Sequence, residues 1–227
     1  MELENITKKR RSEAKRRYGD ACGTAHGLEL IGDRWALLVL RELMLGARRF
    51  SELRADLPGL SANVLTQRLA ELEERGLVRR RTLPPPASAQ VYEATPWGLE
   101  AEPVIQALGR WAARSPLHDP TLPLSGVSIL LSFRTMIDER RARKVDARVG
   151  FVFGKDHYVA RVRKGRIKVA RGDVEACDAV ISAAPTTLAA VVYGGAPIDA
   201  LGISGNRGVI EQFVTLFMLP PKVGMGS

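Results

Sequence analysis

A short helix, a tight turn and a second helix form the feature that most constrains this chain. The stretch SELRADLPGLSANVLTQRLAELEERG runs from residue 51 to residue 76. Ser51 is placed to cap a first helix that ends at Pro58, and Ser61 is placed to cap a second helix from Ala62 to Arg75. Gly76 supplies the stop after that second helix. This order of caps and turn residues predicts a helix-turn-helix.

The second helix of this motif has one apolar and one polar face. A turn of about 100° per residue places Leu65, Leu69 and Leu72 together, with Glu74 opposite. A helix fits the DNA major groove, where Asn and Gln side chains can pair bidentately with adenine. The residues expected on the DNA-contacting surface are Ser61, Asn63, Thr66, Gln67 and Arg68. The alternative is an ordinary helix face in contact with water.

A hairpin is expected directly after the second helix. The stretches LVRRRTL and QVYEAT alternate like two antiparallel strands joined by PPPASA. A hairpin at this place predicts the wing of a winged-helix domain. The cations expected to contact phosphates are Arg48, Arg49, Arg79, Arg80 and Arg81. Such contacts fix register rather than read sequence, and the alternative for the triplet is a solvated strand edge.

A further helix is expected over residues 97–114, where Thr95 caps and Pro96 takes the first position. Its apolar stripe consists of Ile105, Leu108, Trp111 and Ala112. An exposed apolar stripe beside a DNA-reading element predicts a homodimer, because paired motifs read paired half-sites. Packing of the stripe against the second half of the chain is the alternative.

Two stretches of the first half resemble the HxlR family of bacterial winged-helix transcription regulators. They are LELIGDRWALLVLRELMLGARRFSELRADLPGLSANVLTQRLAELEERGLVRRR and VYEATPWGLEAEPVIQALGRW. The resemblance implies a dimer on operator DNA. Family members often carry a cysteine at the position of Cys22, followed by proline where this chain has Gly23, and in some members that thiol senses oxidants or electrophiles. His26, one helical turn on, would favour the thiolate if protonated; a buried, inert Cys22 is the alternative.

The second half predicts an α+β layer of strands between helices. The stretches DAVISAAPTTLAAVVYGG and ISGNRGVIEQFVTLF resemble the sterol-carrier-protein-2-like fold, which implies a pocket for a small hydrophobic ligand. The expected lining residues are Phe151, Phe153, Leu188, Val191, Val192, Phe213, Leu216 and Phe217. These residues would equally form a solid core, in a domain that only assists dimerisation. We expect a winged-helix domain at 1–115, a linker at 116–126 and an SCP2-like domain at 127–227.

The charge balance is compatible with a nucleic-acid partner but does not locate a binding face. The formal net charge is +9; Lys and Arg outnumber Asp and Glu by 19 to 15 up to Ser115 and by 15 to 10 after it. No leader, bilayer-spanning run, zinc ligand set or catalytic triad is evident. We therefore expect a cytoplasmic, non-enzymatic regulator without metal or cofactor, whose operator binding responds to a ligand. The alternatives are a lipid-carrier protein and a regulator switched by thiol oxidation at Cys22.

Overall fold

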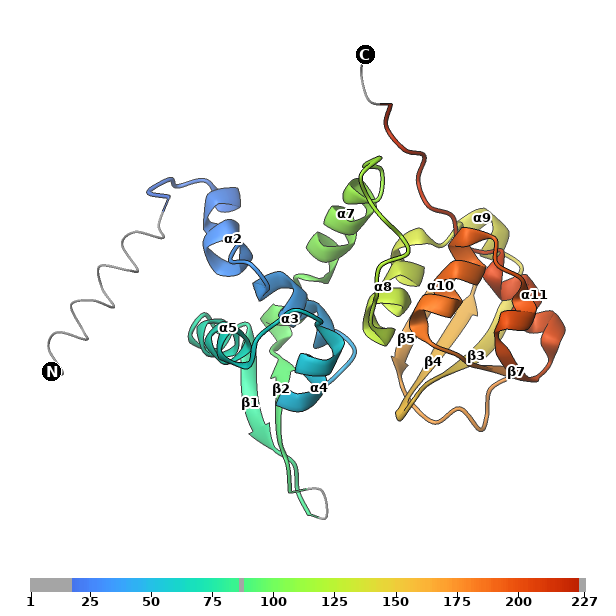
Figure 1. Cartoon of the computed structure of the whole chain (residues 1–227), viewed down its shortest axis with the longest axis horizontal. Helices are drawn as coiled ribbons and strands as arrows, with labels where there is room; N and C mark the ends of the chain where they lie inside the picture. The colour runs from blue at the N-terminus through green and yellow to red at the C-terminus, as the bar shows by residue number, and fades with distance from the viewer. Residues whose placement is uncertain (1–17, 86–87, 225–227) are drawn as a thin grey trace, which may run out of the picture.

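The computed structural model describes residues 18–85 and 88–224 and has a mixed α+β architecture. A mostly helical first half carries a two-stranded hairpin, and the second half is built on a five-stranded sheet (Figure 1). This confirms the predicted class for the chain. Residues 86 and 87 of the predicted hairpin connection lie outside the described residues, as do residues 1–17 of the predicted first domain and residues 225–227 of the predicted second.

The first half contains the predicted helix-turn-helix and wing. Its elements are α2 (Gly23–Ile31), α3 (Ala36–Glu42), α4 (Phe50–Asp56), α5 (Ala62–Glu74), β1 (Val78–Thr82), β2 (Gln90–Ala94), α6 (Pro96–Leu99) and α7 (Glu102–Ala112). The predicted cap of α5 is confirmed, because the Ser61 hydroxyl accepts a hydrogen bond from the Val64 N–H at 3.3 Å. The predicted cap of α4 is wrong by two residues. Arg49 is the N-cap, and its N–H donates to the Glu52 carboxylate at 2.9 Å.

The helix predicted over 97–114 is split into α6 and α7. Thr95 ties α6 to the start of the wing, since its hydroxyl donates to the Gly76 carbonyl at 2.7 Å. Gly98 then lies so close to the Leu77 carbonyl that a Cβ would clash with it. This contact fixes α6 on β1, and α7 starts in a new direction after Ala101.

The second half has three helices over one face of its sheet (Figure 1). Its elements are α8 (Gly126–Met136), α9 (Glu139–Ala142), β3 (Asp146–Phe153), β4 (Asp156–Arg163), β5 (Arg166–Arg171), β6 (Ala179–Ser182), α10 (Pro185–Gly194), the 3₁₀ helix η1 (Ile198–Ala200), β7 (Gly202–Gly205) and α11 (Arg207–Val214). The strand order is β5-β4-β3-β6-β7, with β3 and β6 parallel and the other neighbours antiparallel. Alternate residues of β3, β4 and β5 are buried beneath α8, α10 and α11.

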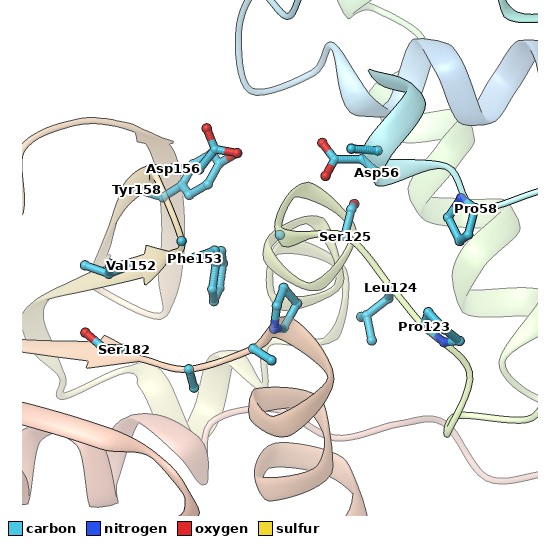
Figure 2. A pocket seen from close by; sticks show the side chains of 16 residues that line it. Asp56, Pro58, Pro123, Leu124, Ser125, Val152, Phe153, Asp156, Tyr158 and Ser182 are labelled. Carbon is cyan, nitrogen blue, oxygen red and sulfur yellow. The ribbon is translucent and has the colours of Figure 1, made fainter. Parts of the chain in front are cut away.

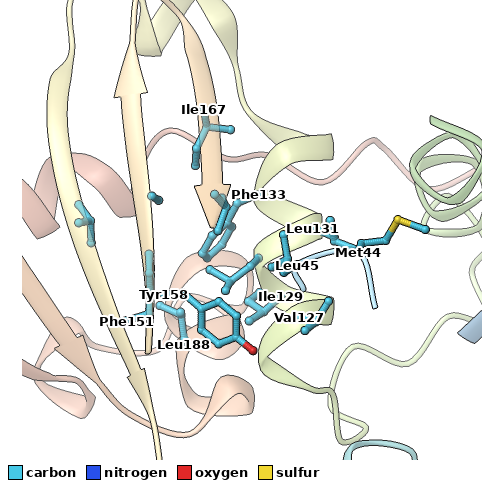
Figure 3. Packing of buried hydrophobic residues seen from close by; sticks show 14 of the residues in the cluster. Met44, Leu45, Val127, Ile129, Leu131, Phe133, Phe151, Tyr158, Ile167 and Leu188 are labelled. Atoms are coloured by element: carbon cyan, nitrogen blue, oxygen red, sulfur yellow. The ribbon is translucent and has the colours of Figure 1, made fainter. Parts of the chain in front are cut away.

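Aromatic rings fill the centre of this second half. Phe133 of α8 stacks on Phe217 with ring centroids 4.4 Å apart, and it meets the edge of Phe213 at 5.6 Å. Phe151 of β3 lies 6.1 Å from Phe133, and the surrounding aliphatic side chains close the core (Figure 3). The packing is that of a solid core, whose dense contacts stabilise the sheet against the helices.

The two halves share one buried hydrophobic cluster. Met44 and Leu45, which follow α3, belong to the same cluster as Val127 and Leu131 of α8 (Figure 3). Helices α7 and α8 also pack against each other. The predicted division at 116–126 therefore stays a prediction. No helix of the described residues is long and apolar enough to cross a bilayer.

Candidate nucleic-acid interface

Helix α5 presents its polar face to solvent, as the sequence predicts. Leu65, Leu69 and Leu72 are buried beneath it. Asn63, Thr66 and Gln67 are exposed on the other side of the helix, together with the N-cap Ser61. The first half thus exposes a helix whose amide and hydroxyl side chains are accessible to a base edge, although the Thr66 hydroxyl donates to the Ala62 carbonyl at 2.9 Å.

Neighbouring side chains restrain two of the predicted DNA-contacting residues on α5. Gln67 donates to the Glu71 carboxylate at 3.0 Å, which fixes its amide on the exposed surface. Arg68 is half-buried: its Nε donates to the Arg34 carbonyl at 3.0 Å, and its guanidinium also contacts Glu71. Arg68 therefore holds α5 to the loop between α2 and α3, whereas Gln67 remains accessible.

The three wing arginines divide between two faces of β1. Arg79 and Arg81 both contact Glu93 of β2, at 2.6 and 3.1 Å. Arg80 points to the other side, where its Nε lies 3.9 Å from a carboxylate oxygen of Glu73 on α5. All three side chains are about half exposed or more, so each can reach a phosphate, but Glu93 offsets part of the positive charge on the first face.

The prediction that Arg48 contacts phosphate is wrong. Its side chain is buried, with the residue only 2% exposed, and its guanidinium contacts Asp56 of α4 and, at 2.7 Å, Asp156 of β4. Burial penalises an unpaired charge, so the two carboxylates explain why a cation can lie there. Arg49, the next residue, is exposed and stays a candidate for phosphate contact.

Asp156 connects this cluster to the second half. It also accepts a hydrogen bond from Arg171 of β5 at 2.9 Å, and Arg171 in turn donates to the Tyr158 hydroxyl at 2.9 Å. Burial raises the pKa of Asp156, but the hydrogen bonds from Arg48 and Arg171 outweigh it and leave the pKa below its ordinary value. An ionised Asp156 therefore bridges the two halves.

A second buried contact joins the halves at the end of α3. The Glu42 carboxylate accepts hydrogen bonds from Arg41 at 2.6 Å and from the Ser125 hydroxyl, at the N-cap of α8, at 2.9 Å. Burial raises the pKa of Glu42 despite these donors. Neither the Ser125 partner of Glu42 nor the Asp156 partner of Arg48 was predicted from the sequence. Ser125 lies 83 residues from Glu42 and Asp156 lies 108 residues from Arg48, so no local sequence pattern indicates either contact.

A cavity of about 660 Å³ lies between the halves. Figure 2 shows Phe153, Tyr158 and Asp156 on one side and Asp56, Ser125 and Leu124 on the other. Helix α10 begins at this cavity, and its N-cap Ala184 provides no side-chain hydrogen bond. The cavity also reaches Pro58, in the turn of the helix-turn-helix, so its contents would touch the DNA-reading unit directly.

The predicted ligand-pocket residues mostly form the core. Six are buried among the helices and the sheet, and Val192 packs against them. The buried six are Phe151, Leu188, Val191, Phe213, Leu216 and Phe217. Only Phe153 of the predicted set lines the cavity between the halves. The predicted position of the pocket is therefore wrong. The side chains expected to line it pack against one another in the core.

Cys22 is exposed, which contradicts the alternative of a buried thiol. It is the N-cap of α2, where the backbone N–H groups of Thr24 and Ala25 lower its pKa. His26 does not contribute to this shift, and its ring contacts the Glu29 carboxylate at 3.3 Å. Helix N-termini favour a thiolate in this way.

Helix α7 packs against α8 with one face and exposes the other to solvent. On the packed face, Glu102 pairs with Arg134 at 3.0 Å and Arg110 donates to the Thr135 carbonyl at 2.9 Å. These are contacts of polar side chains outside the predicted apolar stripe, whose Leu108 and Trp111 do not pack against the second half. The other face exposes apolar side chains, with Trp111 72% exposed. Those side chains are Pro103, Val104, Ala107, Leu108 and Trp111.

Comparisons with known proteins match the first half of the chain. The family model described as HxlR-like helix-turn-helix matches residues 30–118. An HTH-type transcriptional regulator of Synechocystis, sll1512, is 39% identical over 90 residues, which are 40% of this chain and 67% of that protein. The HTH-type transcriptional regulator YodB of Bacillus subtilis is 36% identical over 83 residues, 37% of this chain and 74% of YodB. The structure of reduced YodB is 31% identical, with a TM-score of 0.39, over 44% of this chain and 100% of YodB.

Proposed function

Because the chain belongs, through its first half, to the HxlR-like helix-turn-helix family, we propose that it is a DNA-binding transcription regulator that reads a specific operator. One observation carries this proposal: α5 exposes Asn63, Thr66 and Gln67 above a fully buried leucine face. A helix of this kind can enter the major groove and pair with base edges. The wing arginines and Arg49 then supply backbone contacts on either side.

A gel-shift assay with duplex DNA from upstream of the chain's own gene tests this function. Sequence-selective retardation that weakens with salt is the expected result. The same retardation with scrambled DNA of equal length would contradict operator reading. Binding of labelled fatty acid without any DNA retardation would support the alternative of a lipid carrier.

The regulator acts as a homodimer through the exposed face of α7. Trp111 and Leu108 would be covered by the same helix of a second copy, because a two-fold pair places two α5 helices on two half-sites. The variant Trp111→Glu is expected to run as a monomer in light scattering after size-exclusion chromatography. Wild-type chain that is monomeric at micromolar concentration would contradict this assembly.

Operator binding responds to a small hydrophobic ligand in the cavity between the halves. Phe153, Tyr158 and Leu124 offer it an apolar wall, and Asp56 and Ser125 offer polar groups. Ligand pockets commonly combine an apolar lining with a few polar groups. The contact with Pro58 gives such a ligand a direct route to the turn before α5.

A further inference from the structure

Within the described residues, the excess of positive charge lies in the second half of the chain, away from the helix-turn-helix. Residues 139–168 contain eleven Lys and Arg against three Asp and Glu, an excess of eight, while the net charge of the whole chain is +9. Residues 18–115, by contrast, contain twelve of each sign. The described winged helix therefore has no formal net charge with which to attract a polyanion.

Strand register gathers five of these cations on one face of the sheet. Arg148 of β3 is opposite Arg161 of β4, which is opposite Lys168 of β5; the next row pairs Arg163 with Arg166. Directly opposed side chains share a face and lie about 5 Å apart at Cβ. We call these five residues the basic sheet face: Arg148, Arg161, Arg163, Arg166 and Lys168.

Within the described residues, the basic sheet face is largely exposed and poorly neutralised. The Arg161 and Arg163 side chains are 54% and 60% exposed, and both contact one carboxylate, Asp146, at 3.1 and 3.5 Å. Arg166 and Lys168 are exposed and form no ion pair in this part of the chain, and Arg148 is half-buried with its Nε lacking a hydrogen-bond partner. Opposed like charges destabilise a sheet, so this row has an unfavourable energy that a bound polyanion would remove.

We propose that the basic sheet face binds the phosphate backbone of duplex DNA and is a second DNA contact of this chain. Residues two apart on a strand, such as Arg161 and Arg163, are about 7 Å apart, close to two nucleotide steps of about 3.4 Å along one DNA strand. Four of the five cations are arginines, whose planar guanidinium suits phosphate. The inward side chains between them are buried, so no apolar side chain stands among the five to enter a lipid bilayer.

The DNA contact of the basic sheet face does not depend on recognition of a specific operator, because contacts with the phosphate backbone carry no sequence information. The test is fluorescence anisotropy of the full chain with a random-sequence duplex over a series of salt concentrations. The double variant Arg161→Ala/Lys168→Ala is expected to reduce the slope of log affinity against log salt by about two. The matched control Arg207→Ala/Lys222→Ala removes the same charge from distant sites and is expected to keep the wild-type slope.

Three results would overturn the proposal. The first is an unchanged slope in the Arg161/Lys168 variant, and the second is an equal reduction in the control, which would indicate only net charge. The third is a smaller loss of DNA binding than of binding to phosphatidylglycerol vesicles in that variant, which would assign the face to a membrane. Thermal melts verify that each variant is folded. If the double variant is unfolded, the single variant Lys168→Glu replaces it. A chain without an operator preference would still give the salt slope, so the two proposals fail separately.

Discussion

At the residue scale, Cys22 shows how a helix terminus can prepare a thiol. Its pKa is lowered by the backbone of Thr24 and Ala25, whereas burial raises the pKa of Cys177. We expect iodoacetamide at neutral pH to modify Cys22 first, because the thiolate is the reactive form. Mass spectrometry of the modified peptides gives the order.

The same residue tests the alternative of an oxidation switch. Cys22→Ser is expected to abolish any loss of DNA binding that diamide or a quinone causes, while the control Cys177→Ser responds like wild type. Identical responses of wild type and Cys22→Ser would exclude a switch at this position.

Arg48 is the residue whose removal should cost most stability. Arg48→Ala leaves Asp56 and Asp156 without their shared cation, and breaking a buried ion pair typically costs about 3–5 kcal/mol. Urea unfolding measures this loss. The exposed neighbour provides the control, since Arg49→Ala is expected to change stability by no more than about 0.5 kcal/mol. Equal effects of the two substitutions would show that the buried ion pairs of Arg48 do not contribute to the free energy of unfolding.

At the scale of the element, α5 and the wing should make separable contributions to DNA binding. Gln67→Ala is expected to weaken specific binding by roughly 1–3 kcal/mol and to relax the preference at one base position. Selection from a randomised operator library measures this preference. Gln212→Ala, on the exposed surface of α11, is the control. An unchanged preference would remove Gln67 from the base-reading set.

The wing is expected to act through phosphates alone. Arg79→Ala and Arg81→Ala, which share the face of Glu93, should each weaken all sequences alike and reduce the salt slope by about one. Arg80→Ala is the comparison on the opposite face. A slope that changes only for Arg80 would show that the strand meets DNA with its other side.

At the scale of the whole molecule, the cavity decides whether the second half is a sensor. A long-chain acyl or isoprenoid compound that binds there should raise the melting temperature; at 100 times its dissociation constant the stabilisation is about 2.7 kcal/mol. It should also change operator affinity, since a ligand without differential affinity shifts nothing. Ala184→Trp, at the cavity, should abolish both effects, and Ala190→Trp, exposed on the same helix, should not.

The outcomes for this sensor can be read separately. Stabilisation without a change in operator affinity would leave a lipid-binding module that does not regulate. If no such compound stabilised the chain, the second half would be a scaffold.

Features that depend on neighbouring residues were predictable from the sequence, and contacts between residues far apart in the chain were not. The buried and exposed faces of α5 and the presence of strands between helices in the second half were predictable because helix and strand periods depend on neighbouring residues. The burial of Arg48 was not, because its partner Asp156 lies 108 residues away. The pocket was placed at Phe151 and Phe213 because apolar periodicity does not distinguish a lined cavity from a filled core.

The buried contacts between the halves have a consequence for how such a chain evolves. A module can move between genes only if its surface is complete without its neighbour. Separation of the two halves would leave the Glu42 carboxylate without Ser125 and the Arg48 guanidinium without Asp156, at positions where each is buried. Any later exchange of the second half would have to supply both partners at once. We therefore expect the two halves to be inherited together, because recombination between them would leave both charged groups buried without these partners.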